Sequence, residues 1–192
     1  IAKPPTKRFD KEVGWTFHGH EDLGARWVPK IFQRLKLPLD HKMKFVQKLV
    51  RLHLRPIALV KGSVTDSAIR RLLSEAGDDI EALMILCNAD ITSKNEFKVR
   101  KYKQNFEMVM DKLKAVEEKD RIRNFQPPVS GELIMRTFDL SPCAHIGNIK
   151  ARIKEAILEG EIANDPIEAL HYMLKIGEEI GLPVVVAPTL DK

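Results

Sequence analysis

The sequence predicts an all-α protein, because hydrophobic residues recur at helical spacing in nearly every segment and turn-forming residues separate the segments. The only strand-like run is Val184 to Val186. A length of 192 residues is enough to bury a sizeable core as one large domain or two small ones. We expect a helical bundle over residues 1–125 and a smaller helical subdomain over residues 126–192.

The first two predicted helices each have one apolar side. Between Glu21 and Leu37 the apolar residues recur in steps of three and four: Leu23, Trp27, Val28, Ile31, Phe32 and Leu35. Pro29 lies in this stretch and predicts a kink or a helix boundary. Asp40 is expected to cap the second helix, and Pro56 is expected to end it.

The middle of the chain carries clear helix start and stop signals. Residues 65–67, Thr-Asp-Ser, supply capping oxygens for a third helix, and Gly77 suits the left-handed residue that ends it. The next helix, about 80–91, is apolar on most faces and should be the central core helix. Residues 92–95 then open a long charged helix that reaches about Glu118.

A linker is predicted over residues 123–129, because Gln126-Pro127-Pro128 cannot be helical. Shorter helices follow at about 130–138, 146–158 and 165–180, and Gly160 and Gly181 are expected to end the last two. The tail from Pro183 has no helical period, so we expect an extended or mobile end.

Composition bounds the setting of the protein. No apolar run approaches the roughly 20 residues needed to span a bilayer. Cys87 and Cys143 are the only cysteines, and they lack the paired spacing of metal ribbons or disulfide scaffolds. A cytoplasmic, reducing location is therefore expected. The chain begins at Ile1 and not at Met, which we interpret as a piece of a longer protein.

Basic side chains give a modest excess of positive charge. Lys and Arg number 32 against 27 Asp and Glu, a formal net charge of +5, which is compatible with phosphate-bearing partners but does not require them. Lys150, Arg152 and Lys154 lie near the start of a predicted helix and are candidate nucleic-acid contacts. A second basic group contains Arg51, Arg55, Lys61, Arg70 and Arg71. A solvated helix face with compensating glutamates explains either group as well.

Three polar residues stand where apolar or surface residues would be expected: His20, His53 and Asp90. Their spacing assigns one to each of three predicted helices. Imidazole nitrogens and a carboxylate suit a divalent transition metal such as Mn, Fe, Ni, Co or Zn, especially where side chains converge inside a helical bundle. The alternative is that each is an individually hydrogen-bonded polar group.

Several catalytic arrangements are absent from the sequence. It contains no phosphate-binding or dinucleotide-binding glycine loop and no pattern for a nucleophilic serine. It also lacks the Asp-x-Asp pair that a two-metal nucleotidyl transfer site uses. We therefore expect no catalytic residue for nucleotide polymerisation within the 192 residues.

Six segments, taken in order, resemble one family. They are IAKPPTKRFD, TFHGHEDLGA, LVRLHLRP, DSAIRRLLSEAGDDIEALMILCNADITSKN, RNFQPPVSGELIM and IGNIKARIKEAILEGEIAND. Together they resemble the bacterial CCA-adding tRNA nucleotidyltransferases with a His-Asp (HD) metal-binding domain, a family related to the bacterial poly(A) polymerases. The resemblance runs from Ile1 to about Leu182.

The resemblance implies that the chain begins inside the HD domain and lacks the catalytic head. In that family a His-Asp dyad directly precedes the sequence matching Ile1, so the ligand positions that carry over are His20, His53 and Asp90. A metal site of Mn, Ni, Co, Fe or Zn would then be incomplete here. The segments from residue 123 onward resemble the tRNA-binding body and tail, which makes Lys150, Arg152 and Lys154 plausible phosphate contacts.

The function that the resemblance implies is addition or repair of the 3′-terminal CCA of tRNA by the intact enzyme, which uses ATP, CTP and Mg. One alternative is a stand-alone HD phosphohydrolase, in which metal-bound water attacks a phosphate ester. The segment RNFQPPVSGELIM and the long tail argue against it. Another is the C-terminal region of a bacterial poly(A) polymerase, against which the retention of His20, His53 and Asp90 argues.

Overall fold

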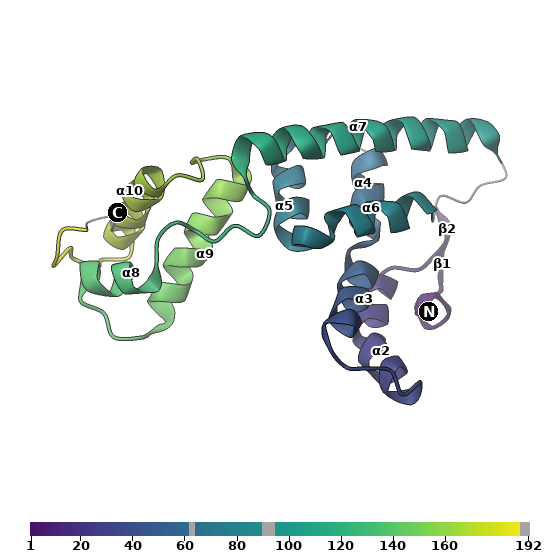
Figure 1. Cartoon of the computed structure of the whole chain (residues 1–192), viewed down its shortest axis with the longest axis horizontal. Helices are drawn as coiled ribbons and strands as arrows, with labels where there is room; N and C mark the ends of the chain where they lie inside the picture. The colour runs from purple at the N-terminus through teal and green to yellow at the C-terminus, as the bar shows by residue number, and fades with distance from the viewer. Residues whose placement is uncertain (62–63, 90–94, 189–192) are drawn as a thin grey trace. The chain divides into compact units, whose positions relative to one another are not determined.

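The computed structural model describes residues 1–61, 64–89 and 95–188, and within them the regular elements are helices apart from one short hairpin (Figure 1). The predicted all-α class is therefore confirmed. The chain forms two compact units: Ile1–Val64 with Ala76–Asp111, and Thr65–Glu75 with Lys112–Lys192. The predicted boundary between residues 125 and 126 lies within the second of these units and stays a prediction.

The first unit opens with a short helix and a hairpin that the sequence pattern did not predict. Helix α1 (Lys3–Thr6) is followed by antiparallel strands β1 (Arg8–Asp10) and β2 (Gly14–Thr16). Three-residue strands are too short to show an alternating pattern in sequence. The turn between them depends on Gly14, whose φ of 80° favours glycine.

Helices α2 (His20–Arg34) and α3 (His41–Leu52) pack side by side in this unit (Figure 1). Helix α2 continues through Pro29, so no boundary lies there. The Asp40 carboxylate accepts a hydrogen bond from the Lys42 backbone N–H at 2.9 Å, which confirms the predicted cap. A Cβ added at Gly24 would lie 3.0 Å from Val50 Cγ1, so this glycine permits the close approach of the two helices.

The expectation that Pro56 ends the second helix was wrong. Helix α3 already ends at Leu52, and Pro56 lies in the first turn of the next helix, α4 (Leu54–Lys61). The backbone N–H groups of a first turn have no partner within their helix, so a missing N–H costs little there. Proline therefore starts a helix here instead of ending one.

Helix α6 (Ile80–Ala89), which follows the 3₁₀ turn Gly77–Asp79, buries one face only. Ile80, Leu83, Met84 and Cys87 are buried, whereas the Ile85 side chain is 72% exposed. The expectation of a central core helix thus holds for one side of α6. Helix α7 (Glu96–Asp120) is the long charged helix, and it begins and ends within two residues of the predicted limits.

The second unit contains α5 (Asp66–Ala76), the end of α7, and helices α8 (Gly131–Phe138), α9 (Ala144–Glu159) and α10 (Pro166–Glu179). The Ser130 hydroxyl and the Asp165 carboxylate cap α8 and α10 by accepting hydrogen bonds from backbone N–H groups of their first turns. Gly160 and Gly181, with φ of 79° and 75°, follow the last two helices. The core of the unit includes Ile69, Leu72, Ile134, Ile149, Ile153, Met173 and Ile176.

The predicted linker is non-helical but packed, since Phe125, Pro127 and Val129 are buried. The tail residues Val184–Val186 form no strand; two of their backbone N–H groups donate to the Thr137 carbonyl. Within residues 1–61, 64–89 and 95–188, no helix has the length and hydrophobicity needed to cross a membrane.

Candidate functional site

Two of the three predicted metal ligands lie together in the first unit. His20 is the first residue of α2, and His53 directly follows α3, so the packing of these helices brings the two rings into contact. The Nε2 atoms of the two imidazoles are 3.2 Å apart, and the ring planes are inclined at 66°. Both side chains are partly buried.

Local hydrogen bonds set the tautomer of each ring. His20 Nδ1 lies 2.7 Å from the Phe17 carbonyl oxygen, and His53 Nδ1 lies 2.6 Å from the Val50 carbonyl oxygen. A carbonyl oxygen only accepts, so each Nδ1 must carry the proton and donate. In the neutral rings the Nε2 lone pairs then face each other. Two lone pairs at this distance repel, so this arrangement suits a cation held between the two Nε2 atoms.

The distance between the nitrogens also fits ligation of one metal ion. Metal–nitrogen bonds of about 2.0–2.1 Å at angles between about 90° and 109° place two ligand nitrogens about 2.8–3.4 Å apart. The observed 3.2 Å lies in this interval. Metal-ligating histidines usually donate their other ring N–H to a carbonyl or carboxylate, as both rings do here. The chemistry of this donor pair therefore fits a divalent transition metal.

Asp90, the third predicted ligand, lies outside the described residues. Within the parts of the chain that are described, no group of three or more His, Cys, Asp or Glu side chains could hold a metal ion. The structure thus gives two candidate ligands, and the complete set His20, His53 and Asp90 stays a prediction.

Two residues beside the histidine pair were missed by the sequence analysis. Glu21 Oε2 lies 3.5 Å from His20 Nδ1 and is buried, and it accepts no hydrogen bond from the described residues. The buried Cys87 thiol donates to the His53 carbonyl at 3.1 Å and so links α6 to the end of α3. An acid adjacent to a predicted ligand was a visible signal for Glu21, whereas nothing local pointed to Cys87.

The predicted RNA contacts lie on α9, beyond its first turn. Lys150 and Lys154 are four residues apart and share one face of the helix, whereas Arg152 lies about 200° around the axis from Lys150. The Lys154 ammonium lies 5.8 Å from the centroid of the Phe125 ring. Both lysines are half-buried, with their stems against the second unit.

Arg152 differs from the two lysines because it pairs with Glu179 of α10. This guanidinium holds the pKa of the Glu179 carboxyl below its ordinary value of 4.5. Arg152 therefore links α9 to α10, and its charge is already partly compensated. Of the three predicted contacts, Lys150 and Lys154 share one face of α9, and Arg152 lies on another.

Two members of the second basic group, Arg70 and Arg71, are committed to ion pairs within the protein. Arg70 donates to Asp120 at 2.7 Å with both side chains largely buried. Arg71 pairs with Glu155 and Glu159 of α9, which raises the pKa of Arg71 and lowers that of Glu159. These arginines join α5 to the rest of the second unit through ion pairs with carboxylates, so their charges are used within the protein.

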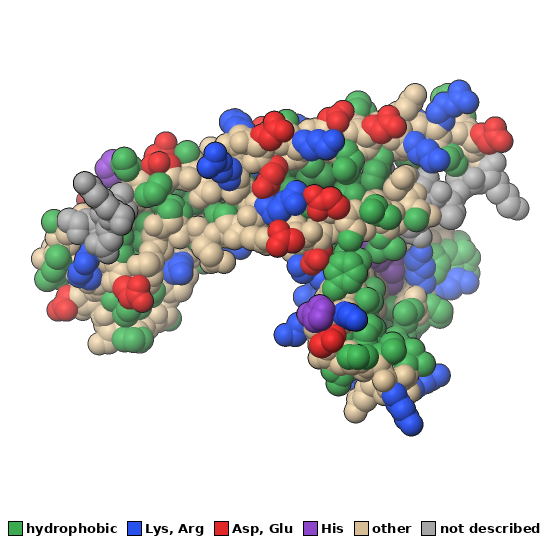
Figure 2. Space-filling model, viewed as in Figure 1, with side chains coloured by type: hydrophobic (Ala, Val, Ile, Leu, Met, Phe, Trp, Pro, Cys, Tyr) green, Lys and Arg blue, Asp and Glu red, His purple; other side chains and the backbone are tan. Residues whose placement is uncertain are grey.

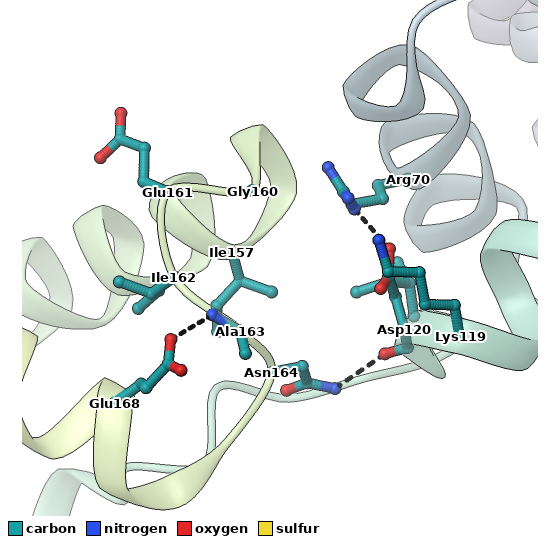
Figure 3. Close-up of a pocket in the computed structure, with 11 residues that line it drawn as sticks. Arg70, Lys119, Asp120, Ile157, Gly160, Glu161, Ile162, Ala163, Asn164 and Glu168 are labelled. Carbon is teal, nitrogen blue, oxygen red and sulfur yellow. Dashed lines mark hydrogen bonds and ion pairs between the residues drawn. The ribbon is translucent and has the colours of Figure 1, made fainter.

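Arg70 also lines a cavity of about 290 Å³ in the second unit (Figure 3). Figure 3 shows the Arg70–Asp120 pair, the Asn164 amide reaching the Asp120 carbonyl, and Glu168 accepting from the Ala163 backbone N–H. These polar groups are satisfied by one another. The cavity therefore has a structural explanation, and we assign it no ligand.

Comparison with known proteins adds one relative. The chain is 29% identical over 185 residues to an A-adding tRNA nucleotidyltransferase of Deinococcus radiodurans, and the alignment covers 93% of this chain. Most of the chain is thus similar to a tRNA nucleotidyltransferase. The chain spans 40% of the length of that relative. No protein-family model matches the chain, and no solved structure matches it.

This similarity covers both compact units, since neither is long enough to hold 185 aligned residues. The alignment to this relative therefore includes both the histidine pair and the lysines of α9. The nucleotidyltransferase resemblance drawn from six short segments is supported at this coarse level. An HD domain and a metal are not part of what the comparison shows.

Proposed function

We propose that this chain is the accessory and RNA-binding portion of a tRNA nucleotidyltransferase that builds or repairs the tRNA 3′ end in the cytoplasm. The observation that carries the proposal is the likeness to a tRNA nucleotidyltransferase over 93% of the chain. The transfer site belongs to other parts of the enzyme, because the sequence has no Asp-x-Asp pair.

The nucleotide substrates follow from the product. ATP is common to A addition and to CCA addition, and CTP is needed in addition for a complete CCA end. Mg²⁺ supports phosphoryl chemistry of this kind by neutralising the phosphates. The relative is named as A-adding, so we expect ATP as a substrate of the parent enzyme in either case.

The contact with tRNA is proposed for the face of α9 that carries Lys150 and Lys154. Both ammonium groups are four residues apart on a helix, which is a spacing that reaches adjacent phosphates. Contacts of this kind position an RNA without reading its sequence. Arg152 lies on the other side of α9, where it pairs with Glu179 of α10.

The test is binding of labelled tRNA to the chain at increasing salt. We expect affinity to fall steeply, and we expect Lys150→Glu with Lys154→Glu to weaken binding and reduce the logarithmic salt slope by about two. The matched control is Lys103→Glu with Lys114→Glu, which makes the same charge change at two exposed lysines on one face of α7. No tRNA affinity at low salt, or an equal loss in the control, would contradict the proposal.

A second activity, phosphate-ester hydrolysis of the HD type, is favoured by the histidine pair. His20 and His53 would hold a divalent transition metal through Nε2, and Asp90 would add a third ligand. When bound, such an ion supplies a Lewis acid that polarises a phosphate oxygen or a water. The protein's own part is to fix both rings, through the carbonyls of Phe17 and Val50, so that both lone pairs point at one place.

A further inference from the structure

The hairpin β1–β2 exposes more apolar surface than its size explains. Phe9 is 64% exposed, Trp15 is 58% exposed, and Val13 in the turn is 73% exposed. Figure 2 shows hydrophobic and basic side chains together over the region of the hairpin that Figure 1 labels. Large aromatic side chains usually contribute to a core, so an exposed pair on a structured element indicates a binding surface.

One face of the hairpin carries both aromatics and a cation. Phe9 is directly opposite Trp15 in the antiparallel register, and the rings meet edge to face with centroids 5.2 Å apart. Lys7, two residues before Phe9, places its ammonium 4.1 Å from the centroid of the Trp15 ring. We name Lys7, Phe9 and Trp15 the aromatic face.

The hairpin is held in shape by its own polar groups. The Asp10 carboxylate accepts from the backbone N–H groups of Glu12 and Val13 at 2.8 and 3.1 Å, and these bonds lower the pKa of Asp10. The Thr16 hydroxyl donates to the Arg8 carbonyl at 3.2 Å. Asp10 is thus engaged in the turn, while the hairpin presents the cations Lys7, Arg8 and Lys11.

We propose that the aromatic face binds an unpaired nucleotide of RNA by stacking, with the Lys7 ammonium near its phosphate. Every base has a π-face, so exposed aromatic rings bind bases without sequence preference, and neighbouring cations complement the phosphate charge. This inference rests on the proposed function, in which the partner is tRNA, and names where an unstacked nucleotide of that RNA is held.

The chain also sets where such a nucleotide lies. His20 follows Thr16, the last residue of β2, by four residues, so their Cα atoms are at most about 15 Å apart at 3.8 Å per residue. Phe17, in the connecting segment, accepts the hydrogen bond that orients His20. The aromatic face and the histidine pair are therefore neighbours along the chain, joined by the segment from Phe17 to Gly19.

The test compares a short single-stranded RNA with a blunt duplex of the same sequence, using anisotropy of the labelled RNA and Trp15 fluorescence. The chain has two tryptophans, so a Trp27→Phe background makes the signal specific to Trp15. We expect the single strand to quench Trp15 and the duplex not to do so. Trp15→Ala should weaken binding of the single strand about 5- to 150-fold, and Trp15→Phe should retain most of the affinity.

The control is Phe97→Ala, which removes another aromatic side chain, 77% exposed on α7, and should leave affinity unchanged. Unchanged binding by Trp15→Ala, with tRNA still bound, would overturn this inference and leave the proposed function standing. If neither RNA nor tRNA binds, both fail. Self-association that Trp15→Ala abolishes, with no discrimination between single strand and duplex, would assign the aromatic face to a second copy and overturn the proposal.

Discussion

The histidine pair combines local hydrogen bonds within each segment with one contact between distant segments. Each Nδ1 donates to a carbonyl three residues earlier, Phe17 for His20 and Val50 for His53, so the tautomer is fixed within each chain segment. The 3.2 Å approach of the Nε2 atoms joins residues 33 positions apart and depends on packing. The two rings are therefore arranged so that their Nε2 atoms could share one cation.

We expect Zn²⁺ or Co²⁺ added to the chain to shift the Nε2 resonances of His20 and His53 together in nitrogen NMR spectra. The other four of the six histidines, which are exposed, should not shift in parallel. Binding should be weaker than at a complete site, since an incomplete ligand set holds metal less tightly. His53→Ala should abolish the shift at His20, whereas His171→Ala should leave it intact. Independent responses of the two rings, or none, would exclude shared ligation.

Among the helices, close packing depends on small residues at the points where two helices meet. Gly177 of α10 faces Phe138 of α8, and an added Cβ would lie 2.4 Å from two carbons of the buried Phe138 ring. Gly147 of α9 has nothing within 4 Å of an added Cβ. Two glycines inside helices thus have different roles, one permitting packing and the other unconstrained.

We expect Gly177→Ala to lower stability by about 1–2 kcal/mol net, because overpacking outweighs the roughly 1 kcal/mol gain in helix propensity. Gly147→Ala makes the same chemical change without a clash and should raise stability by about 0.5–1 kcal/mol. Thermal unfolding followed by circular dichroism measures both. In a Phe138→Leu background the effect of Gly177→Ala should shrink, and an undiminished loss would refute the ring contact as its cause.

The whole molecule consists of two compact units, and its non-helical segments differ in how they are covered. Phe125, Pro127 and Val129 anchor residues 123–129, which the sequence predicted as a linker. Val184, Val185 and Val186 in the tail are 54%, 58% and 45% exposed. Protease sensitivity follows burial and local opening, so these two segments should differ in rate.

We expect subtilisin to cut the chain first in the tail, within 183–188, and to spare 123–129 at early times. Phe125→Ser removes an apolar anchor of the linker and should bring cleavage there to a comparable rate. Mass spectrometry of the early fragments identifies the order. A first cut between residues 123 and 129 in the unaltered chain would show that the linker opens more easily than its burial implies.

Features that depend on neighbouring residues were predictable from the sequence. The caps at Asp40, Ser130 and Asp165 and the stops at Gly160 and Gly181 appeared where their residue types require them. The errors came from features that patterns do not carry: the hairpin is too short to show an alternation, and Pro56 fits a first turn as well as a helix end.

The sequence by itself therefore determined the helical class, most of the longer helices, several of their ends and the choice of His20 and His53 as residues to examine. Only the tertiary structure decided which charges are used internally. Arg70 meets Asp120 across 50 positions and Arg71 meets Glu155 across 84, so both arginines join helices, and Lys150 and Lys154 are the better candidates for RNA. The physical reason is range: a cap or a turn is decided within a few residues, whereas an ion pair or a histidine pair exists only where folding brings distant segments together.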